Sequence, residues 1–271
     1  MNRFENQNIV ITGGSAGIGL AVAREFAKLG GNLFLIARND DQLKIALSSM
    51  KQEYPNILVK TYSADVADHE RMKEVINEIG TSFGGIHTII NNAGTSGHGR
   101  LADQELESLR HVMEVNYFGA LHAIKTAWPY LLKSKEGHIG FVSSVAGYLG
   151  LIGYSAYSPT KFAMSGLAEC MRMEGKEKGI GVTIVYPPDT QTAMLERERV
   201  HALPETVALS KHAKILQPEQ VAKAFVKGIL KRRFEVYCNV ESVWIRRFRT
   251  LLPRLYFSVV DRVAGTGNGK M

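Results

Sequence analysis

Cysteine is scarce in this chain, and long apolar runs are missing. Only Cys170 and Cys238 occur among 271 residues, too few for a disulfide framework. A membrane-spanning helix needs roughly 20 consecutive apolar residues, and the sequence contains no such run. The opening MNRFENQN lacks the apolar segment of a signal peptide. These absences exclude a secreted disulfide scaffold and predict a cytoplasmic protein.

Internal repeats, low-complexity tracts and linkers rich in proline or serine are also absent, so nothing marks a domain boundary. Hydrophobic residues make up 45% and charged residues 22% of the chain, which excludes intrinsically disordered and collagen-like classes. A length of 271 residues suits one large α/β domain. We therefore expect a single domain over residues 1–271.

The chain has an excess of positive charge, and that charge is unevenly distributed. Its 33 Lys and Arg against 26 Asp and Glu give a formal net charge of +7. Seven of the basic residues and only two of the acidic ones lie between Lys231 and Arg254. One Arg-rich stretch with no recognisable nucleic-acid reader fold argues against nucleic acid as a partner.

Short apolar runs alternate with amphipathic stretches along most of the chain. The expected strands are 8–12, 32–37, 57–63, 86–91, 138–144 and 181–186, and the longer expected helices are 18–29, 106–132, 156–178 and 218–230. Parallel strands need crossover connections, which are normally helical. The pattern predicts an α/β fold of the Rossmann type, a doubly wound parallel sheet of about seven strands between two helical layers.

A glycine-rich segment, Thr12–Gly19, lies between the first expected strand and the first expected helix. Glycines there allow the backbone to approach a pyrophosphate, and the helix N-terminus favours its negative charge. A glycine-rich turn alone is a weak signal, but its position between strand and helix supports a dinucleotide site.

The spacing T-G-x-x-x-G-x-G resembles that of the short-chain dehydrogenases/reductases, and later segments extend the resemblance. Asn91–Gly94 is similar to the family's N-N-A-G motif, and Asp65 with Val66 resembles its adenine-contacting position. The resemblance implies a strand order of 3-2-1-4-5-6-7 and homo-oligomerisation through the helices 106–132 and 156–178. It implies cofactor contacts at Thr12, Gly13, Ser15, Gly17, Ile18, Gly19, Asp65, Val66, Asn92, Ala93, Gly94, Tyr157, Lys161, Pro187, Thr190 and Thr192.

Arg38 stands at the end of the second expected strand, where an acidic residue would bind the ribose hydroxyls of NAD. A guanidinium is suited to bidentate pairing with phosphate oxygens. We therefore expect NADPH/NADP+ as the cofactor, with a solvated surface arginine as the alternative; no metal is expected.

Four residues form the candidate catalytic set. Tyr157 and Lys161 are spaced i and i+4, which places them on one face of a helix. Ser144 lies thirteen residues upstream of Tyr157, and Asn116 lies in the expected helix 106–132. Their spacing resembles the family's catalytic tetrad.

Carbonyl reduction needs a hydride and a proton, and these side chains can handle the proton. Tyr157 is the expected donor, and a neighbouring Lys161 cation should lower the phenol pKa towards the working pH. By resemblance, Lys161 also binds the nicotinamide ribose. Ser144 would stabilise the developing charge. Asn116 is expected to hold a relay water, although an Asn in a helix can also satisfy backbone groups.

The segment after the sixth expected strand departs from the family pattern. Pro188 replaces the usual glycine, and Tyr186–Thr192 resembles the 3-ketodihydrosphingosine reductases, a subfamily that reduces 3-ketosphinganine to sphinganine. The resemblance implies NADPH-dependent reduction of a long-chain, lipid-like ketone. A 3-oxoacyl or hydroxysteroid reductase of the same family is the first alternative, and a cofactor-sensing binding protein without turnover is the second.

The long segment 188–217 is polar and lacks clear periodicity, so we expect it to be a substrate loop. The expected substrate contacts are Ser144, Leu149, Leu151 and Met194. The three apolar side chains could equally be buried against the sheet.

The C-terminal segment 244–260 carries apolar residues at helical spacing, from Trp244 to Val260. Arg246, Arg247, Arg249 and Arg254 are expected on its other face, with a break or kink at Pro253. A basic amphipathic helix of this kind can lie on the cytoplasmic face of a membrane. It can also cover the substrate loop or pack in an oligomer, because amphipathicity does not choose the partner.

Overall fold

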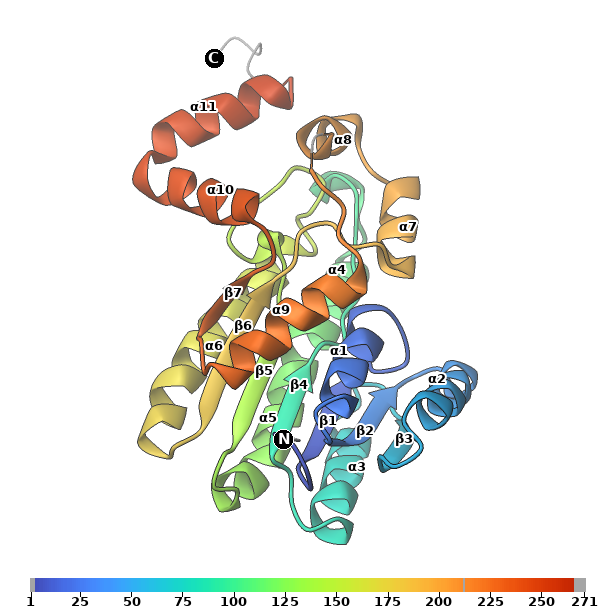
Figure 1. The fold of residues 1–271 in the computed structure, drawn as a ribbon. Coiled ribbons are helices and arrows are strands. Elements are labelled where there is room, and N and C mark those ends of the chain that lie inside the picture. The colour runs from blue at the N-terminus through green and yellow to red at the C-terminus, as the bar shows by residue number, and fades with distance from the viewer. Residues whose placement is uncertain (1–2, 212, 266–271) are drawn as a thin grey trace.

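The computed structural model describes residues 3–211 and 213–265, so positions 1–2, 212 and 266–271 of the expected domain lie outside it. Seven parallel strands form one sheet in the order β3-β2-β1-β4-β5-β6-β7, as expected (Figure 1). The strands are β1 Asn8–Thr12, β2 Asn32–Ala37, β3 Val59–Ser63, β4 Thr88–Asn91, β5 His138–Val142, β6 Gly181–Tyr186 and β7 Glu235–Tyr237.

The α-helices connect the strands and extend beyond them. They are α1 Gly17–Ala27, α2 Asp40–Glu53, α3 His69–Ser82, α4 Leu106–Met113, α5 Gly119–Lys133, α6 Ser158–Glu177, α7 Ala193–Val200, α8 Pro204–Ser210, α9 Pro218–Leu230, α10 Val240–Leu251 and α11 Pro253–Val263. Short 3-10 turns span Leu101–Asp103 and Val145–Gly147, and a π-helical turn spans Glu114–Phe118.

Two hydrophobic cores lie on opposite faces of the sheet, because side chains alternate along each strand. In β1, Val10 faces the core formed with α3, α5 and α6, whereas Ile9 and Ile11 face the core formed with α1, α2 and α9. All three side chains are fully buried. Helices on both faces bury every residue of β1, β4, β5 and β6, as in other parallel sheets, whereas the edge strands β3 and β7 are partly exposed.

The expected elements differ from the observed ones mainly at their ends. The third strand begins at Val59 instead of residue 57, because the Ile57 amide donates to Tyr54 O in a turn. The expected helix 106–132 is interrupted by the π-helical turn that contains Asn116. The expected loop 188–217 contains the two helices α7 and α8.

The C-terminal segment forms two helices, and the chain turns at Leu252 just before Pro253, as expected. Arg246, expected on the face opposite the apolar side chains, points towards the body of the protein, and 33% of its side chain is exposed. Its guanidinium lies 5.5–5.8 Å from the ring centroids of Tyr148, Tyr186 and Tyr237 and pairs with Glu235. The aromatic rings attract this cation and turn Arg246 towards the body of the protein.

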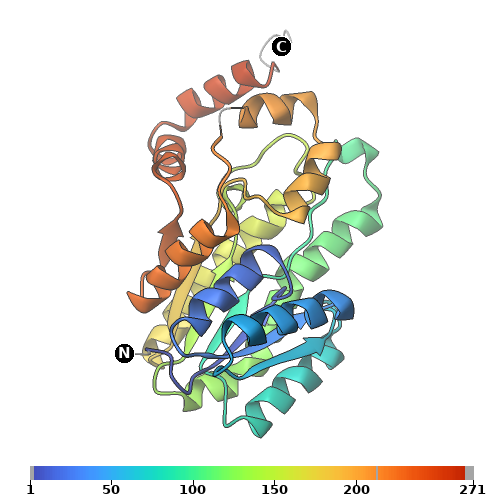
Figure 2. The same ribbon diagram turned by 45° about the vertical axis from the view of Figure 1, so that its right-hand side comes forward.

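The helices α7, α8, α10 and α11 gather beyond the carboxyl ends of the strands (Figures 1 and 2). The helix α8 contacts α11, so the expected substrate loop and the C-terminal helices meet there. In the described part of the chain, no helix has the length and apolar character needed to cross a membrane. The carboxyl edge of the sheet is where open α/β sheets bind ligands.

Candidate active site

The turn between β1 and α1 requires glycine at several positions. Gly13 and Gly17 have φ values of +66° and +53°, in the left-handed region that favours glycine. A Cβ atom on Gly19 would lie 2.2 Å from the carbonyl oxygen of Gly13. The backbone of Thr12–Gly19 therefore leads directly into the N-terminus of α1, the arrangement that binds a pyrophosphate.

Asn92, just after β4, holds this turn in place. Its side-chain amide donates to the carbonyl oxygens of Thr12 at 3.0 Å and of Gly13 at 3.1 Å. The Thr12 hydroxyl in turn accepts from the backbone amides of Asn92 and Ala93, both at 3.1 Å. The segment Asn91–Gly94 thus links β4 to the glycine-rich turn on β1.

A groove runs from the glycine-rich turn to the candidate catalytic residues. Of the expected cofactor contacts, those that line it are Gly13, Gly17, Ile18, Asn92, Ala93, Gly94, Tyr157, Lys161 and Thr192. Gln42 and Arg197 also line the groove and were not predicted. The tight glycine backbone and the helix N-terminus fit a nicotinamide dinucleotide.

Other expected cofactor contacts lie outside the lining of this groove. Thr12 and Gly19 pack against Asn92 within the turn, and Ser15 is half-buried beside them. Val66 is 6% exposed and belongs to the hydrophobic core, where it packs against Gly119. Burial explains why its side chain does not line the groove.

Arg38 and Asp65 meet at the ends of β2 and β3. The Arg38 guanidinium lies 3.6 Å from the Asp65 carboxylate, and 60% of the Arg38 side chain is exposed. Asp65 also accepts from the backbone amide of Ala67 at 3.0 Å. Only one guanidinium edge therefore meets Asp65, and most of the Arg38 side chain remains accessible.

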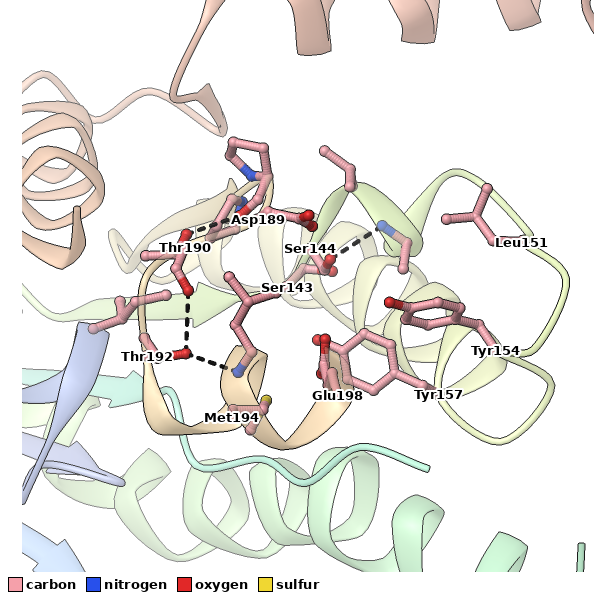
Figure 3. Close-up of a pocket in the computed structure, with 16 residues that line it drawn as sticks. Ser143, Ser144, Leu151, Tyr154, Tyr157, Asp189, Thr190, Thr192, Met194 and Glu198 are labelled. Atoms are coloured by element: carbon pink, nitrogen blue, oxygen red, sulfur yellow. Dashed lines mark hydrogen bonds between the residues drawn. The ribbon is translucent and has the colours of Figure 1, made fainter. Parts of the chain in front are cut away.

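Ser144 and Tyr157 line one cavity at the carboxyl edge of the sheet (Figure 3). Ser144 follows β5, and its hydroxyl accepts from the Ala146 amide at 3.1 Å. Tyr157 stands at the N-terminal cap of α6, and Lys161 follows one turn later. The Lys161 ammonium lies 5.5 Å from the Tyr157 ring centroid and donates to Val142 O at 3.1 Å.

The pKa values of the two titratable groups are shifted by burial. Burial raises the pKa of Tyr157, a hydrogen bond from Ser144 opposes the shift, and Glu198 adds to it. Burial lowers the pKa of Lys161 to about 8. The expected lowering of the Tyr157 pKa by Lys161 is therefore not found here. The phenol stays protonated and is available as a proton donor.

Asn116 is fully buried in the π-helical turn. Its side-chain oxygen accepts from the Thr95 amide at 2.8 Å, and its nitrogen donates to Thr95 O and to the Thr160 hydroxyl, both at 2.9 Å. The side chain ties the loop after β4 to α6. Both amide donors are used, and the side-chain oxygen keeps one lone pair for a further donor such as a relay water.

The expected substrate residues divide between the cavity and the core. Leu151 and Met194 line the cavity that contains Ser144 and Tyr157. Leu149 was also expected to contact the substrate, and this expectation is wrong, because Leu149 is 6% exposed and packs in the hydrophobic core. Pro187 and Thr190, expected at the cofactor, line this cavity, whereas Thr192 lines both the cavity and the groove.

Four polar residues that line the cavity were not predicted from the sequence: Ser143, Tyr154, Asp189 and Glu198. Figure 3 shows Glu198 beside Tyr157, projecting from α7. Burial raises the pKa of Glu198 to about 7 and also raises the pKa of Asp189. Glu198 stands in the run Glu196–Arg199, whose alternating charges resemble an exposed helix face.

The short chain dehydrogenase family model matches residues 7–202. A 3-dehydrosphinganine reductase of Danio rerio is 38% identical over 235 residues, covering 86% of this chain and 71% of that protein. The 3-ketodihydrosphingosine reductase of Mus musculus is 38% identical over 84% of this chain and 69% of that protein. The Dictyostelium discoideum protein of the same name is 34% identical and covers 96% and 82% of the two chains.

Solved structures show the same fold. A short-chain dehydrogenase/reductase from Burkholderia phymatum, in complex with NAD, superposes with a TM-score of 0.83 at 24% identity and 94% and 96% coverage. An alcohol dehydrogenase from Thermococcus sibiricus, complexed with 5-hydroxy-NADP, superposes with a TM-score of 0.74 at 25% identity, with 85% and 95% coverage. The chain therefore belongs to the short-chain dehydrogenase/reductase family and is an oxidoreductase that uses a nicotinamide cofactor.

Proposed function

We propose that the protein catalyses the NADPH-dependent reduction of 3-ketosphinganine to sphinganine. The observation that carries this proposal is the 38% identity to reductases named for that substrate, over 84% or more of this chain. The matched length of 235 residues is greater than the span 7–202 that the family model matches, so the similarity extends beyond the part common to the whole family.

The residues of the cavity suit the proton side of a carbonyl reduction. When bound in the groove, the nicotinamide cofactor supplies a hydride. The protonated phenol of Tyr157 gives its proton to the ketone oxygen as that oxygen gains electron density. The Ser144 hydroxyl donates a hydrogen bond to the same oxygen. The Lys161 ammonium lies 5.5 Å from the Tyr157 ring centroid and lines the cofactor groove, where it can bind the nicotinamide ribose.

A preference for NADPH over NADH is proposed from the end of β2. The residue there is Arg38, and its mostly exposed side chain can pair with a phosphate on the ribose. Asp65 lies on the neighbouring strand end and engages the guanidinium at 3.6 Å. A phosphate would compete with Asp65 for this arginine, because a phosphate offers the guanidinium two oxygens in the bidentate geometry that it favours.

The cavity and the helices around it suit a lipid substrate. Leu151, Met194 and Leu195 contribute apolar lining near the catalytic pair. Beyond them, α10 and α11 expose large apolar side chains together with arginines, including Trp244 at 62% and Phe257 at 50% exposure. We propose that these helices lie on the cytoplasmic face of an anionic membrane, where a sphingoid ketone resides.

The test is NADPH consumption with 3-ketosphinganine in detergent micelles, beside an acetoacetyl thioester and a steroid ketone. Selective turnover of the sphingoid ketone is expected. Preference for either of the other ketones would retain the reaction type and overturn the proposed substrate. Cofactor binding with no turnover of any ketone would overturn the proposed catalysis.

A further inference from the structure

An acidic side chain lies inside the active-site cavity without a permanent cationic partner. Glu198 projects from α7 beside Tyr157, and 13% of its side chain is exposed (Figure 3). Within residues 3–211 and 213–265, its only neighbour within the 4.0 Å limit for an ion pair is His98, at 3.8 Å. No lysine or arginine nitrogen of the described chain lies that close.

His98 does not neutralise this carboxylate at neutral pH. Burial lowers the pKa of His98 below its ordinary value, so the ring is mostly uncharged at pH 7. Its Nε2 atom is buried and has no hydrogen-bond partner within the described residues. The imidazole therefore leaves the charge of Glu198 uncompensated.

A second carboxyl group adds to the negative potential. Asp189 follows β6 and lines the same cavity, and its pKa is raised by burial. A hydrogen bond from Ser96 lowers the pKa of Glu198, as do Lys161 and Arg197, but neither cation comes within ion-pair distance of the carboxylate. Burying an ionised carboxylate is costly unless a cation or hydrogen bonds meet it. The cavity therefore has an acidic side that favours a cationic ligand.

We propose that Glu198, assisted by Asp189, binds a protonated amine on the carbon next to the ketone that is reduced. This inference rests on the proposed function, because the substrate proposed above is such an amino ketone. A ketone oxygen at Ser144 and Tyr157 brings the adjacent substituent to the side of the cavity where Glu198 stands. The apolar lining at Leu151 and Met194 is then left for the hydrocarbon chain.

Glu198 is thereby assigned to substrate selection. Neutral 3-oxoacyl and steroid ketones carry no cation to offset the buried carboxylate, so binding them leaves that group unpaired. An amino ketone supplies the missing charge. The cavity should therefore give an amino ketone a lower KM than a neutral ketone of equal chain length.

The experiment compares two substrates in the Glu198→Gln variant. The substrates are 3-ketosphinganine and 1-hydroxyoctadecan-3-one, which keeps the chain, hydroxyl and ketone but lacks the amine. The ratio of their kcat/KM values should fall at least about tenfold in the variant, mainly through KM, since losing one partner of a buried charged pair costs that much or more. An equal loss on both ketones would overturn the inference.

Glu196→Gln is the matched control, because Glu196 lies on the same helix but is exposed and contacts Gln191. It should leave the ratio unchanged. Glu198→Gln keeps the shape of the side chain, and its folding is checked by its thermal unfolding midpoint.

A second measurement uses the unmodified protein. Sphinganine should inhibit the NADPH-loaded enzyme at least about tenfold more tightly than octadecane-1,3-diol, and equal inhibition would overturn the assignment. Turnover of 3-ketosphinganine with equal inhibition would leave the proposed function intact. Absence of that turnover would overturn both proposals.

Discussion

The dinucleotide groove and the substrate cavity meet at Tyr157 and Thr192 but are built in different ways. The groove is shaped by backbone. Gly13 and Gly17 adopt positive φ, and a Cβ on Gly19 would clash with the carbonyl oxygen of Gly13. The cavity is shaped by side chains from α7, from the turn after β5 and from the segment after β6. A backbone requirement fixes residue type and spacing, whereas a side-chain cavity leaves both open.

The largest expected effect comes where the two regions meet. Tyr157→Phe removes the proton donor and keeps the ring, so kcat/KM should fall by about 10²–10⁴-fold. The NADPH dissociation constant, measured by fluorescence, should stay near that of the unmodified protein. Turnover retained in this variant would contradict the role given to Tyr157.

Tyr130→Phe is the control for loss of a phenol hydroxyl. Tyr130 donates to Asn77 at 3.0 Å on the helical layer opposite α1 and α9, away from both regions. Its kcat/KM should be close to the unmodified value. A comparable loss in both tyrosine variants would point to general destabilisation.

The next effect belongs to the groove alone. Arg38→Asp replaces the proposed phosphate partner by a carboxylate, so the ratio of kcat/KM with NADPH to that with NADH should fall by about 10–100-fold. Arg110→Asp makes the same charge change at an exposed position on α4 and should leave the ratio unchanged. An unaltered ratio in Arg38→Asp would show that Arg38 does not distinguish the cofactors.

Much of the groove could be predicted from the sequence, and less of the cavity. The glycine spacing, Asn92 and the four catalytic candidates fall at the carboxyl edge because strand ends and turn geometry place them there. The substrate contact Leu149 was wrong because an apolar residue after a strand can face the core or the cavity equally well.

The features that were missed depend on contacts between distant segments. Glu198 looked like part of an exposed charged run, and only the packing of α7 over Tyr157 buries it. The contacts of Arg246 could not be predicted, because the three tyrosine rings near its guanidinium come from separate segments of the chain. The π-helical turn at Asn116 gave no signal in the hydrophobic pattern, which runs continuously through it.

A third effect concerns the acidic side of the cavity. The pKa of Glu198 is raised by burial from 4.5 to about 7, so the folded state binds this proton more tightly than the unfolded state. Stability from this group is present at low pH and is lost as the pH rises towards and through 7. Asp189 adds to the shift, whereas Ser96, Lys161 and Arg197 oppose it.

Glu198→Gln removes this dependence. Relative to the unmodified protein, the variant should gain about 1–3 kcal/mol of unfolding free energy between pH 5 and pH 8. Denaturant unfolding at both pH values measures the difference, with Glu196→Gln as the control. An equal difference at the two pH values would mean that Glu198 does not titrate in this range.

The smallest effect is expected at the proposed membrane face. Arg247→Gln with Arg254→Gln removes two exposed charges from α10 and α11, so partitioning onto phosphatidylserine vesicles should weaken several-fold. Lys133→Gln with Lys135→Gln, at the amino-end side of β5, serves as the control. Equal partitioning of both double variants would argue that α10 and α11 pack against protein instead.

The proposed activity is reduction of a sphingoid ketone by NADPH at the site formed by Ser144, Tyr157 and Lys161. The most direct test measures sphinganine formed from 3-ketosphinganine by mass spectrometry, together with the NADPH consumed, in the unmodified protein and in Tyr157→Phe. We expect one sphinganine for each NADPH in the unmodified protein and almost none in the variant. NADPH consumption without sphinganine, or equal sphinganine from both proteins, would contradict it.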